Sequence, residues 1–191
     1  MPRSDTALLA PAEGTNEAAR VRLGAASDTA PDVLRSLASD PAVTVRAAVA
    51  MNPATAGDTD LVLAQDRDER VRTLLARKLA SLVPSLGVAD RAALRERALS
   101  TLNRLVNDEA VRVREAIADV LKDMPQAPRS IIMQLARDVA TSVFDPVVRL
   151  SPLLGSDDLL ALLAGAPAID VPGAGRDSEL SRHAHRWDGV R

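Results

Sequence analysis

The residues best placed to do chemistry in this sequence are arginines and aspartates that recur at a fixed spacing. An Arg follows an Asp by six residues in three copies of one phrase: Asp40 and Arg46, Asp66 and Arg72, Asp108 and Arg114. A guanidinium group binds a phosphate or a carboxylate through two parallel hydrogen bonds. These arginines could therefore form a basic ladder that grips phosphates or an acidic partner. One Arg for each Asp at a constant offset favours another interpretation, in which each Arg bonds a capping Asp or a carbonyl group of an adjacent repeat.

A fourth copy of the phrase lacks the arginine. Leu135-Ala136-Arg137-Asp138 reproduces the approach to the Asp, but Phe144 occupies the position of the Arg. We interpret Phe144 as the end of the ladder, where either the Arg is not needed or the surface changes. Arg70 and Arg112 do not repeat strictly, so we expect them to face solvent and, with Phe144, to be candidates for contacts with a partner. A weaker copy, Val21-Arg22, precedes the first full one by 24 residues.

Other combinations of reactive side chains are sparse. The chain has no Cys, and its two histidines, His183 and His185, lie together near the C-terminus. Two histidines without further ligands make an incomplete zinc site, so we predict no metal and no cofactor. We interpret Lys78 and Lys122 as members of surface ion pairs. The acidic pairs at positions 66/68 and 157/158 are expected at helix starts, where the helix dipole favours negative charge. The sequence therefore predicts a protein that is not an enzyme.

The repeated phrase predicts two helices joined by a tight turn. Asp is a good N-cap because its carboxylate accepts hydrogen bonds from the free backbone amides at a helix start. We therefore expect Asp40-Pro41 to begin a helix, and Asp66 with Glu69 to form a capping box. Aliphatic residues four apart after each Asp predict one apolar face per helix. Helix pairs of this kind must stack, and the sequence predicts an all-α fold, a right-handed α-solenoid.

The phrase L-A-x-D-x-x-x-x-V-R resembles HEAT-type repeats and the related leucine-rich repeat variant. The later part of the chain resembles the bacterial DUF2336 family. The residues that carry this second resemblance are Leu135-Ala136-Arg137-Asp138, Val143, Pro146-Val147, Leu150-Ser151-Pro152-Leu153-Leu154 and Ser156-Asp157-Asp158-Leu159-Leu160. Together the resemblances cover about residues 20–164 and imply short HEAT-like helical pairs. The DUF2336 family implies no established activity.

Composition narrows the expected function. The 191 residues are 47% hydrophobic but only 1% aromatic, and the formal net charge is −2. Nucleic-acid-binding repeat proteins need a basic face, with aromatic side chains on which bases stack. Nucleic-acid binding is therefore the alternative rather than the leading function. The sequence contains no run of about 18 apolar residues, the length that predicts a membrane span. We expect a cytoplasmic protein.

We expect one domain over residues 1–164, built from four to five helical repeats, and a mobile tail over residues 165–191 that holds Trp187 and both histidines. The leading function is a non-enzymatic protein-interaction or regulatory scaffold module with an unidentified protein partner, because α-solenoids expose long surfaces. Terminal repeats normally carry polar outer faces. The last repeat instead ends in the apolar residues Leu159, Leu160, Leu162 and Leu163. We therefore expect a homodimer through the C-terminal end.

Overall fold

The structure is a computed structural model that describes residues 16–86 and 92–165. These residues form ten α-helices and no strand, so the described chain is all-α, as predicted. The helices are α1 (Glu17–Ala25), α2 (Pro31–Leu37), α3 (Val43–Met51), α4 (Gly57–Leu63), α5 (Glu69–Ser85), α6 (Ala92–Leu105), α7 (Val111–Leu121), α8 (Arg129–Leu135), α9 (Thr141–Leu150) and α10 (Ser156–Gly165). The expected tail with His183, His185 and Trp187 lies almost wholly outside the described residues.

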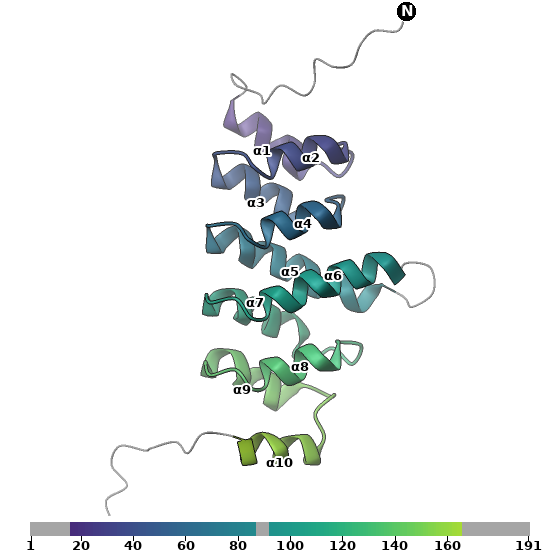
Figure 1. The fold of residues 1–191 in the computed structure, drawn as a ribbon, viewed down its shortest axis with the longest axis vertical. Coiled ribbons are helices and arrows are strands. Elements are labelled where there is room, and N and C mark those ends of the chain that lie inside the picture. Colours follow the sequence, from purple (N-terminus) through teal and green to yellow (C-terminus); the bar gives the residue numbers. More distant parts are fainter. Residues whose placement is uncertain (1–15, 87–91, 166–191) are drawn as a thin grey trace, which may run out of the picture.

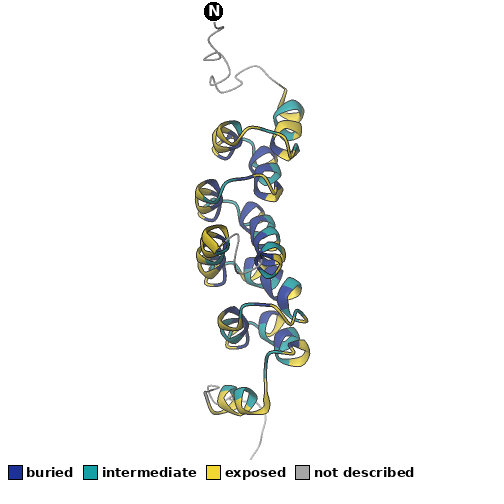
Figure 2. Cartoon of the chain, turned by 90° about the vertical axis from the view of Figure 1, so that its right-hand side faces the viewer, coloured by how far each residue is buried: buried dark blue, intermediate teal, exposed yellow. Residues whose placement is uncertain are grey.

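The helices follow one another along the long axis of the molecule in two layers (Figures 1 and 2). The odd-numbered helices form one continuous stack, in which α1 contacts α3, α3 contacts α5, α5 contacts α7, and α7 contacts α9. The even-numbered helices lie beside this stack and are exposed on their outer side (Figure 2). No described helix has the length and apolar character that crossing a bilayer requires.

Aliphatic side chains fill the space between the layers. Val45, Leu75, Ile117 and Val143 come from four successive odd-numbered helices, and each is fully buried. Each stands five or nine residues after an Asp of the repeated phrase. The apolar pattern that predicts one buried face per helix therefore corresponds to the core of the stack.

The first three odd-numbered helices have a constant period. They begin at Glu17, Val43 and Glu69, which are 26 residues apart. Arg20 therefore holds the position in α1 that Arg46 holds in α3. The sequence pattern places the weaker copy of the phrase at Val21-Arg22, and its Arg is wrong by two residues. A Val-Arg pair recurs easily by chance, whereas the helix face that packs on the next repeat fixes the alignment of the repeats.

The aspartates do not cap helices in the way the sequence predicts. Helix α3 begins at Val43 with Ala42 as N-cap, so Asp40-Pro41 lies in the turn before the helix. The N-cap of α5 is Asp68, not Asp66, and its carboxylate accepts a hydrogen bond from the Arg70 backbone N–H. The expected capping box of Asp66 with Glu69 is therefore wrong. Asp40 and Asp66 instead accept a bond from the backbone N–H two residues later, at 2.9 Å in each case, which closes an Asx turn.

Small residues let the odd-numbered helices approach closely. Gly24 is buried in α1, and a Cβ atom built on it would lie 3.2 Å from both Ala48 Cβ and Val49 Cγ2. Alanine occupies the same position one and two periods later, at Ala50 and Ala76, and both are fully buried. A larger side chain here must separate two helices of the stack.

Helix α10 ends the described stack with its apolar residues only partly covered. Leu160 and Leu163 are 64% and 74% exposed. Leu162 is partly buried against the core. In Figure 1, α10 lies beyond α9 at the end of the molecule.

We predict that Gly24→Val destabilises the protein by about 1–3 kcal/mol, because the added methyl groups overpack the contact between α1 and α3. Ala25→Val is the matched control, since Ala25 is the next residue of the same helix and is exposed. Urea unfolding followed by circular dichroism measures both. Equal midpoints for the two variants would show that α1 and α3 are not closely packed.

Candidate functional site

The repeated arginines and aspartates form one ladder of ion pairs between successive repeats. Each Arg donates from Nε and Nη2 to both carboxylate oxygens of the Asp in the following repeat. The Nε–Oδ2 distances are 2.7 Å for Arg20–Asp40, 2.6 Å for Arg46–Asp66, 2.7 Å for Arg72–Asp108 and 2.6 Å for Arg114–Asp138. This two-bond geometry is the strongest that a guanidinium and a carboxylate can form.

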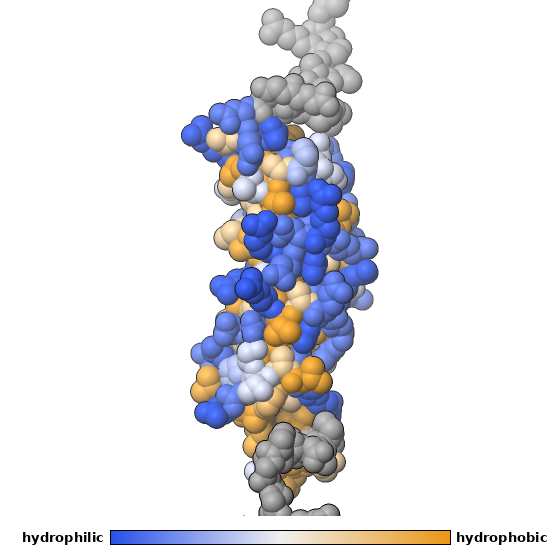
Figure 3. Space-filling view, turned by 90° about the vertical axis from the view of Figure 1, so that its left-hand side faces the viewer, coloured by the Kyte–Doolittle hydropathy of each residue, from blue (hydrophilic) through white to orange (hydrophobic). Residues whose placement is uncertain are grey.

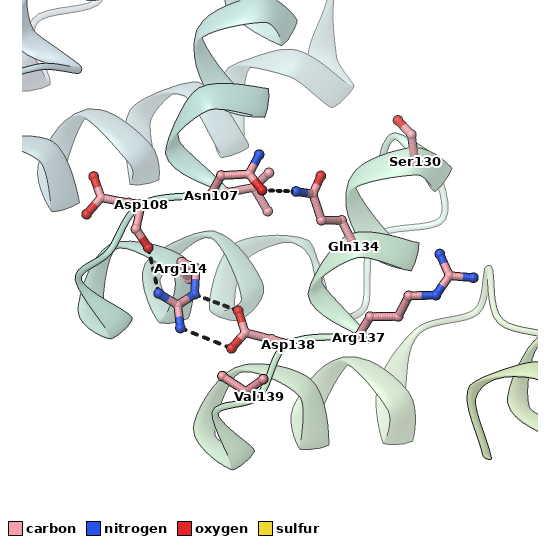
Figure 4. Close-up of a pocket in the computed structure, with 9 residues that line it drawn as sticks. Asn107, Asp108, Arg114, Ser130, Gln134, Arg137, Asp138 and Val139 are labelled. Atoms are coloured by element: carbon pink, nitrogen blue, oxygen red, sulfur yellow. Dashed lines mark hydrogen bonds and ion pairs between the residues drawn. The ribbon is translucent and has the colours of Figure 1, made fainter. Parts of the chain in front are cut away.

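The third nitrogen of each of the three later arginines bonds within its own repeat. Nη1 donates to the carbonyl oxygen of the Asp six residues earlier, from Arg46 at 2.8 Å, Arg72 at 2.7 Å and Arg114 at 2.6 Å. Figure 4 shows both sets of bonds around Arg114. The offset of six seen in the sequence is therefore the carbonyl contact, and the carboxylate partner lies 20, 36 or 24 residues further on.

The ladder lies under the surface. The exposed fractions of the Arg46 and Asp66 side chains are 6% and 5%, and those of Arg72 and Asp108 are 11% and 9%. Burial alone would raise the pKa of Asp138, but hydrogen bonds from Arg114 and from the Ala140 backbone outweigh it and lower that pKa. These guanidinium groups face carboxylates and not solvent, so they are poorly placed to bind a phosphate or an acidic partner.

The ladder ends at Phe144. Phe144 is half-buried in α9, at the position from which an Arg would reach the next repeat. The end of α10 repeats the leucines of the phrase, but Gly165 and Ala166 stand three residues after Leu162 and Leu163, where an Asp is expected. The donor of a fifth pair is therefore missing, and no Asp stands at the offset of three from these leucines.

Arg70 and Arg112 lie at equivalent places in the first turns of α5 and α7. Their side chains are 70% and 76% exposed. Arg70 pairs with Asp68 at 2.7 Å, and this contact together with the backbone bond from Arg70 lowers the pKa of Asp68 to about 2. Arg112 reaches Glu69 of the preceding odd-numbered helix at 3.3 Å. Both side chains are open to a partner.

Lys78 and Asp60 form a buried ion pair, so the surface position expected for Lys78 is wrong. Lys78 Nζ donates to Asp60 Oδ1 at 2.6 Å and to the carbonyl oxygen of Asn52 at 3.3 Å. The exposed fractions of the Lys78 and Asp60 side chains are only 9% and 7%. Burial raises the pKa of Asp60 and lowers that of Lys78, and in each case the ion pair opposes the effect without reversing it. Lys122 does make the expected surface pair, with Asp119 at 3.1 Å.

Lys78 has a visible counterpart in the sequence, one period earlier. Asn52 stands 26 residues before it and donates from Nδ2 to the carbonyl oxygens of Gly24 and Ala26, both at 2.8 Å. Each of these two side chains therefore bonds a carbonyl at the end of the preceding odd-numbered helix. Lys78 differs from Asn52 in two respects. It lies inside a helix, because α5 continues to Ser85, and it carries a positive charge that Asp60 balances.

Within residues 16–86 and 92–165, no group of three or more His, Cys, Asp or Glu side chains could hold a metal ion. Comparison of the chain with family models, with curated proteins and with solved structures finds no match.

We predict that Arg72→Met and Asp108→Leu each destabilise the protein by about 3–5 kcal/mol, because each change leaves one buried charge unpaired. The double variant should lose less than the sum of the two, since it removes both charges. Arg112→Met is the control for an exposed pair and should cost less than about 1 kcal/mol. Chemical unfolding of the wild type, the two single variants and the double variant gives the coupling energy. Additive losses would contradict a direct pair.

The buried pair predicts a pH dependence. A raised pKa means that ionised Asp60 lowers stability increasingly as pH rises above the ordinary aspartate value. A lowered pKa means that charged Lys78 lowers stability until pH approaches the ordinary lysine value. Asp60→Leu/Lys78→Met should therefore gain most relative to the wild type near about pH 7, and the gain should shrink towards about pH 4 and pH 10. Thermal unfolding across this range measures it. A gain that does not vary with pH would rule out the buried pair as its source.

Proposed function

We propose that the chain is a right-handed α-solenoid of HEAT-like helix pairs and that it acts as a non-enzymatic protein-interaction or regulatory scaffold module. The two-layer stack of short helices and the ladder that joins repeat to repeat support the architecture. The resemblance to the DUF2336 family belongs to the same proposal. A cytoplasmic setting is part of it as well.

The observation that carries the interaction proposal is the pair of exposed arginines on the stack. Arg70 and Arg112 lie on adjacent odd-numbered helices and present their side chains at equivalent positions. The ladder fixes the spacing of these two helices. The backbone positions that carry the two arginines therefore keep a constant separation before any partner binds. Arg is also enriched among the residues that dominate protein–protein affinity.

A second surface of the proposed module is its C-terminal end. Phe144 is half-buried where the ladder stops, and Leu160 and Leu163 are exposed on α10. An apolar end beyond the last pair of the ladder suits a homodimer contact, because apolar association needs no paired charges.

We predict that a photo-crosslinking amino acid at position 112 captures a specific protein in the native cell, whereas the same group at position 22 does not. Arg22 is the matched control because it is another exposed arginine of the stack. Arg70→Glu/Arg112→Glu should lower recovery of that protein about tenfold, as expected for contact residues. Equal crosslinking from both positions would contradict the proposal.

Sedimentation of the same purified proteins tests the second surface. The wild type should associate as its concentration rises, and Leu160→Glu/Leu163→Glu should stay monomeric, because two charges would have to be buried on association. Leu23→Glu is the control, since Leu23 is exposed at the opposite end of the stack. A wild type that is monomeric at all concentrations would overturn the dimer.

A further inference from the structure

A polar groove opens on the edge of the stack between the turn joining α6 to α7 and the turn joining α8 to α9 (Figure 4). Its volume is about 570 Å³, within the range of roughly 300–1,000 Å³ common for ligand sites. The same edge is seen face-on in Figure 3, where hydrophobic groups lie among hydrophilic ones and become more frequent towards the C-terminal repeats.

One wall of the groove is a polar stripe that begins on α8 and continues into the turn after it. Ser130 and Gln134 lie four residues apart on one face of α8, and Arg137 follows in the turn beyond the C-cap Ala136. Figure 4 shows all three side chains. Gln134 Nε2 donates to Asn107 Oδ1 across the groove, and Asn107 Nδ2 donates to the carbonyl oxygen of Asn103 at 2.8 Å. Each amide nitrogen of this chain uses one of its two N–H donors, and Gln134 Oε1 is left as an acceptor.

One arginine of the groove belongs neither to the ladder nor to an ion pair among the described residues. Its two aspartates, Asp108 and Asp138, are neutralised by ladder arginines at 2.7 and 2.6 Å. Arg137 is exposed, points away from the ladder in Figure 4 and forms no ion pair with any residue that the structure describes. Asp158, at the start of α10, forms its ion pair with Arg129 at 2.6 Å, and the charge of Arg137 helps to lower the pKa of Asp158 without a direct contact.

An exposed aliphatic side chain lies in the same turn, on the other side of Asp138 from Arg137 (Figure 4). Val139 is 92% exposed, more than any other large hydrophobic side chain in the described part of the chain. The corresponding positions of the other three turns hold Pro41, Arg67 and Glu109. Arg137 itself is replaced by Ser39, Gln65 and Asn107 in those turns. The combination of a free guanidinium and an open aliphatic group therefore occurs at this turn alone among the four.

We propose that this groove binds an extended acidic peptide segment of a partner protein. A carboxylate side chain pairs with the Arg137 guanidinium, a peptide N–H donates to Gln134 Oε1, and an apolar side chain packs on Val139. The proposal rests on the interaction function proposed above and names the chemistry of one partner segment. A peptide with separated carboxylates fits better than a phosphate-rich polymer, because the described lining of the groove offers one exposed guanidinium outside the ladder and no further cation for a chain of successive negative charges.

Fluorescence anisotropy with a labelled peptide of alternating Glu and Val residues tests the groove. We expect binding at low salt, a loss of about tenfold or more in Arg137→Glu, and a similar loss for the wild type with a Gln–Val peptide. Arg22→Glu is the matched control and should bind as the wild type does. Both substitutions are at exposed positions, and thermal unfolding of each variant confirms that it is folded.

Nuclear magnetic resonance locates the site independently of affinity. The side-chain amide signals of Gln134 and Asn107 should shift on addition of the Glu–Val peptide, and Val139→Ser should weaken binding. Equal binding by the Arg137 and Arg22 variants, or by the Glu and Gln peptides, would overturn the proposal. So would tighter binding of glutarate or of oligothymidylate than of the peptide. Crosslinking at position 112 does not depend on this groove, so the proposed function can survive its failure.

Discussion

The contact on which the whole stack depends is the two-way bond of each ladder arginine. Arg46, for example, holds the carbonyl of Asp40 behind it and the carboxylate of Asp66 ahead of it. Asp66 in turn fixes its own turn through the backbone N–H of Asp68. A shift of one repeat against the next would break charged hydrogen bonds that are nearly inaccessible to water, and such breaks are expensive. The ladder thus fixes the spacing between successive helix pairs. Packing of small aliphatic side chains alone would define that spacing less precisely.

The sequence predicts the helix pairs well and the contacts between them less well. The Leu, Asp, Val and Arg of the phrase mark each turn and each buried face because these are local patterns. The partner of Arg72 is a different matter, since its carboxylate lies 36 residues away, beyond the long helices α5 and α6. Only the stacked arrangement brings them together. The caps fail for a related reason: Asp40 closes a turn two residues before its helix, and the sequence alone does not distinguish an Asx turn from an N-cap.

Lys78 shows how tertiary context changes the meaning of a residue. A lone lysine on a helix next to acidic residues is normally solvated. Here the period of 26 residues places it where Asn52 stands in the preceding repeat, at the carbonyl end of a neighbouring helix. The comparison with Asn52 is a signal that the sequence contains. It becomes readable only once the register of α1, α3 and α5 is known, because the two side chains share no chemistry except hydrogen-bond donation.

In a structure whose buried arginines are all engaged by aspartates, the informative arginines are those outside the ladder. Arg137 immediately precedes a ladder aspartate and is therefore carried on one of the most constrained turns of the stack. The backbone that carries it is therefore fixed before a carboxylate binds, which lowers the entropy lost on binding. Among the described residues, none after Phe144 is carried on such a turn, because the ladder stops there. The recognition by charge that we propose at Arg137 and the apolar association that we propose at α10 lie on different parts of the chain, and Phe144, where the ladder ends, stands between them in the sequence.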